Sequence, residues 1–145
     1  MNFWFYRPKI DHARVVAAIT AAELQTSGEI RVVLCRHKVA DPVVAAQREF
    51  ARLGMTATTA RNGVLLYLAP RSRNFAVIGD TGVHEKCGDA FWTELAAAMT
   101  EHFKRGDFTA GLIHGIEHAG DLLAQHFPHT DGDRNELPDD IEEID

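Results

Sequence analysis

The stretch "HGIEH", from His114 to His118, has the spacing H-x-x-E-H, in which two histidines one helical turn apart could bind zinc beside a glutamate. On a helical wheel both histidines fall far from the apolar stripe of this segment and point to water. A catalytic zinc also needs a third ligand and a walled cavity, and no obvious residues supply them. The pattern is therefore interpreted as a solvated helix face rather than as the site of a zinc peptidase.

The acidic stretch "DGDRNELPDDIE", residues 131–142, is a second candidate, because it matches several positions of a calcium-binding loop. The matching residues are Asp131, Asp133, Asn135, Asp139 and Glu142. However, Glu136 stands where the loop needs glycine for its sharp turn, and Pro138 occupies the usual apolar position. Composition favours a solvated acidic tail, and calcium binding by this stretch remains the alternative.

A third candidate is a set of carboxylates that lie far apart in the sequence. Its members are Glu29, Asp80, Glu85 and Asp89. Carboxylate oxygens are hard ligands that suit calcium or magnesium, and a bound cation would relieve the repulsion between them. These residues can act together only if the fold gathers them at one place.

Hydrophobic periodicity predicts the elements that would position them. A helix is expected over about residues 10–25 and a β-branched strand over 29–36, followed by a second helix. Asp41 and Pro42 open that second helix as its N-cap and first residue, and Gly54 ends it.

The remaining sequence predicts two strands, 63–69 and 75–80, joined as an antiparallel hairpin. A glycine-containing loop up to Gly88 is expected after them. Aspartates then cap two helices, 89–106 and 107–128. Since a strand, a helix and a strand in succession form a right-handed parallel unit, the fold is of the α/β class, with a small mixed sheet flanked by helices.

This topology gathers the third candidate set at one edge of the sheet. The third strand runs antiparallel to the other two, so its end at Asp80 lies at the edge where the first strand starts at Glu29. The loop that follows carries Glu85 and ends near Asp89. We therefore expect these carboxylates to converge and to bind a divalent cation.

The same residues allow a purely structural interpretation. Glu29 and Asp80 could form ion pairs with Arg61 or Arg31, and Asp89 could merely cap a helix. Structural and functional carboxylates look alike in sequence, so both interpretations stand.

Composition is typical of a globular protein with one domain. The chain has 145 residues, of which 46% are hydrophobic and 25% are charged, and its formal net charge is -6. This acidity argues against nucleic-acid binding, which needs a basic surface. We expect one domain over residues 1–128, with an aromatic N-terminal arm, and an irregular acidic tail over 129–145.

The apolar run at the N-terminus is too short for a signal sequence or a membrane span. Cys35 and Cys87 are too few for a disulfide framework, and neither belongs to a C-x-x-C pair. A cytoplasmic location without membrane insertion is therefore expected.

Several segments, taken together, resemble the TPM domain family. They are "TSGEI" at the first strand, "NGVLL" from Asn62 to Leu66, the glycine turn from Gly82 to Glu85, and "FKRGDFTAGL" from Phe103 to Leu112. The resemblance covers roughly residues 19–127. Within the family, the chain is similar to a short bacterial branch without a signal peptide or membrane anchor. The resemblance implies a three-layer α/β/α sandwich that is Rossmann-like but lacks a dinucleotide fingerprint. It also implies binding of divalent metal, chiefly calcium, at the loop edge, and an acid phosphatase activity reported for a plant member.

Three functions follow as hypotheses. In the first, the domain is not an enzyme, and it binds Ca²⁺ or Mg²⁺ to order the loop and to recruit a partner. In the second, the same ion assists hydrolysis of phosphomonoesters, with His84 as acid or base and Arg61 holding the phosphate. In the third, a metal-independent scaffold docks an unidentified protein through the aromatic arm and the acidic tail.

Overall fold

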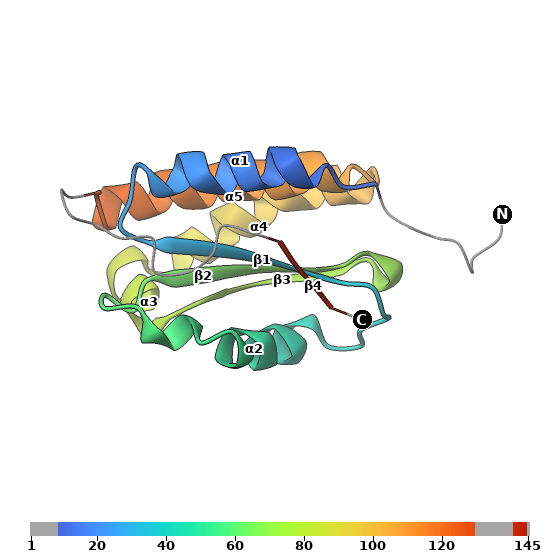
Figure 1. The fold of residues 1–145 in the computed structure, drawn as a ribbon, viewed down its shortest axis with the longest axis horizontal. Coiled ribbons are helices and arrows are strands. Elements are labelled where there is room, and N and C mark those ends of the chain that lie inside the picture. The colour runs from blue at the N-terminus through green and yellow to red at the C-terminus, as the bar shows by residue number, and fades with distance from the viewer. Residues whose placement is uncertain (1–8, 130–140, 145) are drawn as a thin grey trace, which may run out of the picture.

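The computed structural model describes residues 9–129 and 141–144, which form a mixed sheet between two layers of helices (Figure 1). The helices are α1 (His12–Glu23), α2 (Pro42–Arg52), α3 (Thr81–Cys87), α4 (Asp89–Lys104) and α5 (Phe108–His126). The strands are β1 (Glu29–Cys35), β2 (Gly63–Ala69), β3 (Asn74–Gly79) and β4 (Ile141–Ile144). This arrangement confirms the predicted α/β sandwich.

The sheet has the strand order β3-β2-β1-β4. β1 and β2 run parallel with Glu29 opposite Gly63, and β2 and β3 run antiparallel with Val64 opposite Gly79. The starts of β1 and β2 and the end of β3 therefore lie together at what we call the amino end of the sheet. The opposite end, where β1 and β2 finish and β3 begins, is called the carboxyl end.

Helices cover both faces of the sheet because the two central strands, β1 and β2, are buried on both sides. One face, with Val32 and Leu66, packs against α1, α4 and α5. The other face, with Val33 and Leu65, packs against α2. Within residues 9–129 and 141–144, no helix combines the length and apolar character that crossing a membrane requires.

Capping residues set two helix boundaries as predicted. Asp41 accepts hydrogen bonds from backbone N–H groups in the first turn of α2, and Gly54 follows that helix with a φ of 68°. Asp107 caps α5 in the same way. The prediction that Asp89 caps α4 is wrong, because Gly88 occupies the cap position and Asp89 is the first helical residue.

The segment after β3 is a helix, α3, where a loop was predicted. Asp80 serves as its N-cap. Gly82 does not break the helix but lets it approach the chain before β2, since a Cβ at this position would stand 2.3 Å from the carbonyl oxygen of Ala60. A contact distant in sequence therefore outweighs the low helix propensity of glycine here.

The prediction of an irregular acidic tail is wrong for residues 141–144. Ile141–Ile144 form β4, which runs parallel to β1 with Ile141 opposite Val32. Without β4, the buried strand β1 would be an unpaired edge of the sheet. Residues 1–8, 130–140 and 145, which include most of the predicted arm and tail, lie outside the described residues.

Replacing Ile141 by alanine tests whether β4 stabilises the sheet. The side chain is 6% exposed and belongs to the core beneath α1, so its loss should lower the free energy of unfolding by about 2–4 kcal/mol. Urea unfolding followed by circular dichroism measures the change. Leu24→Ala is the matched control, because it truncates an isomeric side chain that is 68% exposed. Equal, small effects of both substitutions would show that β4 contributes little.

Candidate functional site

Asp80 lies at the amino end of the sheet, between β3 and α3. Its side chain is only 4% exposed, and its carboxylate accepts a 2.7 Å hydrogen bond from the backbone N–H of Thr81. Arg61 donates to both oxygens, from Nε to Oδ2 at 2.6 Å and from Nη2 to Oδ1 at 2.8 Å. For Asp80, the structure therefore shows the ion pair with Arg61 that the sequence allowed as an alternative.

The turn before β2 places Arg61 beside Asp80. The φ of Arg61 is 53°, in the left-handed region that residues other than glycine rarely adopt. The carbonyl oxygen of Arg61 accepts a 2.9 Å hydrogen bond from the N–H of Gly82. The segments before β2 and after β3 are thus joined by one backbone hydrogen bond and one bidentate ion pair.

Burial raises the pKa of the Asp80 carboxyl group, but hydrogen bonds from Arg61 and Thr81 and the positive charge nearby outweigh it. The pKa of Asp80 is therefore held below its ordinary value of 3.8. Hydrogen bonding to Asp80 in turn raises the pKa of the Arg61 guanidinium. Both partners are charged at neutral pH.

His84 lies near this pair on α3, and Trp92 of α4 holds its ring. Trp92 Nε1 donates a 3.2 Å hydrogen bond to Nδ1 of His84, and the two ring centres are 4.8 Å apart. Because Nδ1 accepts, a neutral His84 carries its proton on Nε2. The sequence does not reveal Trp92 as a partner of His84, since the contact depends on how α3 packs against α4.

The remaining predicted ligands differ in how far they are buried. Glu29 is buried at the start of β1, at 2% exposure, whereas Glu85 and Asp89 are exposed on α3 and at the start of α4. Within the described part of the chain, no group of three or more His, Cys, Asp or Glu side chains is placed to hold a metal ion. A cation site that uses these carboxylates would require side chains to move.

The two histidines of "HGIEH" lie along the interface of α5 with α4. His114 is exposed as predicted, and its Nδ1 is 3.0 Å from Nε2 of His102. His118 is only 32% exposed, and its Nε2 is 3.8 Å from Oε2 of Glu94. The prediction that both side chains point to water is therefore wrong for His118, because α4 partly covers that side of α5.

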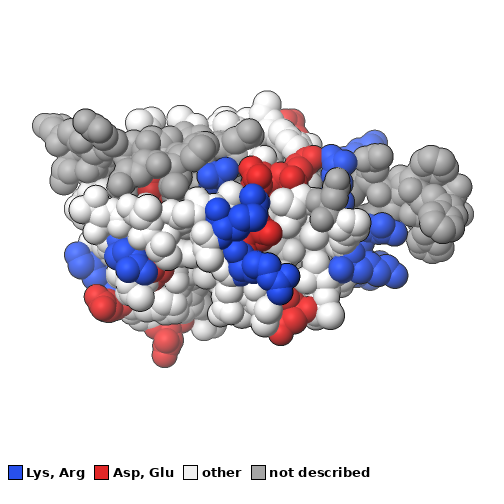
Figure 2. Space-filling model, turned by 60° about the horizontal axis from the view of Figure 1, so that its bottom comes forward, with Lys and Arg blue, Asp and Glu red and all other residues white. Residues whose placement is uncertain are grey.

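Of the residues that match a calcium loop in the tail, only Glu142 is described. Its carboxylate lies 3.5 Å from Arg31 and 3.4 Å from Arg52. Figure 2, which turns the α2 side of the molecule forward, shows basic and acidic side chains next to one another on this surface. The other matching residues lie outside the described ranges, so calcium binding by the tail stays a prediction.

Residues 9–122, which contain every described element except β4 and the end of α5, match the family model of the TPM domain. The chain belongs to the TPM domain family. This confirms the resemblance seen in the sequence. No match was found among the curated proteins.

Solved structures are similar to this TPM domain. The BA42 protein from the psychrophilic bacterium Bizionia argentinensis is 40% identical, with 92% of each chain covered and a TM-score of 0.86. The N-terminal domain of a P. gingivalis protein is 20% identical over 79% of this chain and 76% of that one, with a TM-score of 0.61. The N-terminal domain of the cg2496 protein from Corynebacterium glutamicum is 18% identical over 91% of this chain and 77% of that one, also with a TM-score of 0.61. At these lower identities, the last two show the fold alone.

The segments that carry the family resemblance have structural roles in this TPM domain. Asn62, at the entry of β2, donates a 3.2 Å hydrogen bond to Ser27. Gly106, with a φ of 74°, forms the joint between α4 and α5. A Cβ at Gly111 would stand 2.3 Å from the ring of Phe103, so glycine lets α5 approach α4 closely. Much of the resemblance therefore reflects packing rather than chemistry.

Asp80→Asn should change how the stability of the protein depends on pH. A carboxyl group whose pKa is lowered on folding stabilises the protein above its unfolded pKa, and this contribution disappears as pH falls through the folded pKa. The wild type should therefore lose stability more steeply than Asp80→Asn as the pH falls past 3.8.

Thermal midpoints measured from about pH 7 to about pH 3 give this comparison. Glu85→Gln removes an exposed carboxylate from the same helix and serves as the control. Parallel curves for wild type and Asp80→Asn would contradict the stabilising role assigned to the ion pair.

Proposed function

We propose that this TPM domain binds a divalent cation, calcium or magnesium, at the amino end of its sheet, with Asp80 as the central ligand. The observation that carries the proposal is a contrast within the ion pair: the side chain of Asp80 is 4% exposed, whereas that of Arg61 is 47% exposed. The fold fixes the carboxylate in place, but its counter-charge belongs to a long side chain at the surface. An incoming cation can displace that side chain and take over the carboxylate.

Other carboxylates near this position support the proposal. Carbonyl and carboxylate oxygens are the ligands that calcium and magnesium prefer. Glu85 and Asp89 are exposed, so their side chains are able to turn toward an ion.

The backbone conformation of Arg61 also supports the proposal. A φ of 53° is unfavourable for a residue with a side chain. Strained residues of this kind persist where the surroundings enforce them, and they are frequent at binding sites.

Arg61→Gln tests the proposal, because it removes the competing charge and leaves the ligand in place. In chelator-treated protein the variant should be less stable than wild type, since the buried carboxylate of Asp80 loses its partner. Calcium or magnesium should then raise the thermal midpoint of Arg61→Gln more than that of wild type. A ligand at about a hundredfold its dissociation constant adds about 2.7 kcal/mol, which corresponds to several degrees.

Two aspartate variants complete this experiment. Asp80→Asn should abolish the rise in thermal midpoint, because the central ligand is gone. Asp41→Asn removes another N-cap carboxylate, at the start of α2, and should respond to the cation like wild type. The proposal fails if the wild type and Arg61→Gln do not respond, or if the response survives in Asp80→Asn.

The position of His84 favours a second function at the same place, metal-assisted hydrolysis of phosphomonoesters. With Nδ1 accepting from Trp92, the proton on Nε2 is available for a leaving-group oxygen. Arg61, once displaced from Asp80, would present its guanidinium to the phosphate. The cation would supply polarisation of a phosphoryl oxygen and a more acidic bound water.

His84→Gln should lower magnesium-dependent turnover of phenyl phosphate, whose leaving group needs a proton, by about a hundredfold or more. The same variant should keep the cation-dependent rise in thermal midpoint, which separates loss of chemistry from loss of binding. His126→Gln, at the exposed end of α5, is the control. Equal turnover in the two variants, or no turnover in wild type, would contradict the hydrolytic role.

A further inference from the structure

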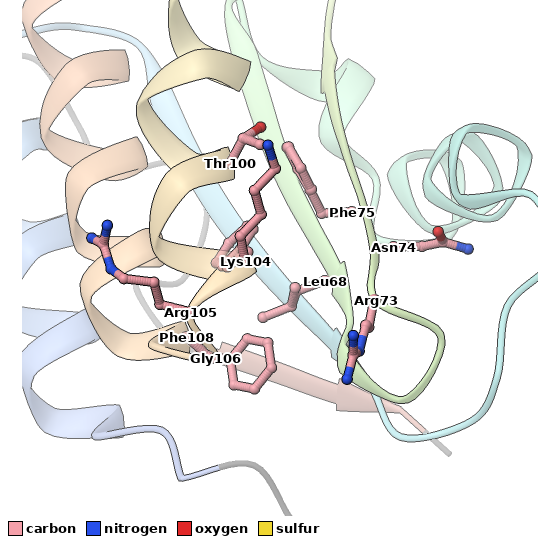
Figure 3. A pocket seen from close by; sticks show the side chains of 10 residues that line it. Leu68, Arg73, Asn74, Phe75, Thr100, Lys104, Arg105, Gly106 and Phe108 are labelled. Carbon is pink, nitrogen blue, oxygen red and sulfur yellow. The ribbon is translucent and has the colours of Figure 1, made fainter.

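A cavity of about 480 Å³ opens at the carboxyl end of the sheet, remote from Asp80. It lies between the end of β2, the start of β3 and the joint of α4 with α5 (Figure 3). Its volume falls in the range of about 300–1,000 Å³ that is usual for small-molecule sites. Ligands of open α/β sheets commonly bind beyond the carboxyl ends of the strands, and Leu68, the last residue but one of β2, lines this cavity.

One part of the lining is aromatic. Phe75, Phe103 and Phe108 line the cavity with Leu68, and the ring centres of Phe75 and Phe103 are 5.1 Å apart in an edge-to-face arrangement. Phe75 and Phe103 are only partly buried, so they leave apolar surface open to the cavity. A flat apolar body bound there would bury this surface.

The other part of the lining is basic. Arg73, Lys104 and Arg105 line the cavity together with no acidic residue, although the protein has a formal net charge of -6. Figure 3 shows the charged end of Lys104 beside Thr100 on α4 and the guanidinium of Arg73 near the opposite end of the lining, whereas Arg105 points away from both. Nη2 of Arg105 lies 3.2 Å from Nδ1 of His102. Arg73 and Lys104 therefore place their charges at opposite ends of the lining.

These two cations are weakly neutralised. Among residues 9–129 and 141–144, no acidic side chain pairs with Arg73. Lys104 Nζ lies 3.8 Å from Glu101, but the two side chains are 69% and 71% exposed, and such a surface pair contributes little. Arg73 and Lys104 thus retain the capacity to bind an anion.

We propose that this cavity binds a small organic oxyanion, a carboxylate or phosphate group carried on an aromatic body. The anionic group pairs with Arg73, and the ring lies against the aromatic lining that Phe75, Phe103 and Phe108 form. Packing of the α4–α5 joint accounts for the phenylalanines but not for two cations at the rim of the same opening. The site shares no residue with the proposed cation site, so neither proposal depends on the other.

Titration of the isotopically labelled full chain with phenylphosphonate and with benzoate, followed by amide NMR shifts, tests the proposal. Saturable shifts should centre on Phe75, Lys104 and Gly106 with at least one of the two probes. Tighter binding of phenylphosphonate would identify a phosphate ligand, and tighter binding of benzoate a carboxylate. Inorganic phosphate should bind more weakly than phenylphosphonate, since it brings no ring to bury.

Arg73→Gln should weaken binding by about fivefold or more, as expected when one charge-assisted hydrogen bond is lost, and Lys104→Gln should weaken it less. Arg71→Gln removes the same charge from an exposed neighbour that does not line the cavity, and it should leave the affinity unchanged. Thermal midpoints establish that each variant is folded. Absence of saturable shifts, shifts confined to the surroundings of Arg61, or an equal loss in Arg71→Gln would overturn the proposal.

Discussion

The parallel pairing of β1 with β2 is the interaction on which the rest of the structure depends. Every residue of both strands is buried, so helices must cover both faces of the sheet, with α2 on one face and α1, α4 and α5 on the other. The short turn Pro70–Ser72 then returns β3 antiparallel to β2 and brings Asp80 to the end where β1 and β2 start. The same turn places Arg73 at the other end. One pairing thus creates two sheet ends that differ in chemistry.

Elements with a regular apolar pattern could be predicted from sequence, and elements specified by distant contacts could not. β1, β2 and α2 carry their own signals, in buried apolar runs and in the caps around α2. β4 does not, because Ile141 and Ile144 pack on opposite faces of the sheet and the strand forms only by adding to the edge of β1. α3 contains Gly82, and glycine is a poor helix former, but its lack of a side chain allows a close approach to Ala60.

The candidate site was predictable at the level of topology but not of side chains. The strand directions alone place Glu29 and Asp80 at one end of the sheet. The ion pair of Asp80 depends on the left-handed turn at Arg61, which no local pattern announces. Because α3 is a helix, Glu85 lies exposed on it rather than beside Asp80 in a loop. The cavity at the carboxyl end is assembled from segments far apart in sequence, so only the general preference of ligands for that end of a sheet indicates where to look.

An arginine in a left-handed turn lies at each end of the sheet, but only one of the two arginines meets a carboxylate. Among the described residues, Arg61 and Arg73 are the ones other than glycine with positive φ, and each precedes a strand of the β2–β3 hairpin. Because β2 and β3 run antiparallel, the two turns fall at opposite ends of the sheet, and each presents an arginine there. At the amino end the arginine meets the buried carboxylate of Asp80, so the proposed cation would have to compete with it. At the carboxyl end Arg73 pairs with no acidic side chain of the described residues, so its charge remains available to an anion. In the two proposals, the kind of ion that each end would bind therefore depends on whether a carboxylate faces the arginine, rather than on the turn itself.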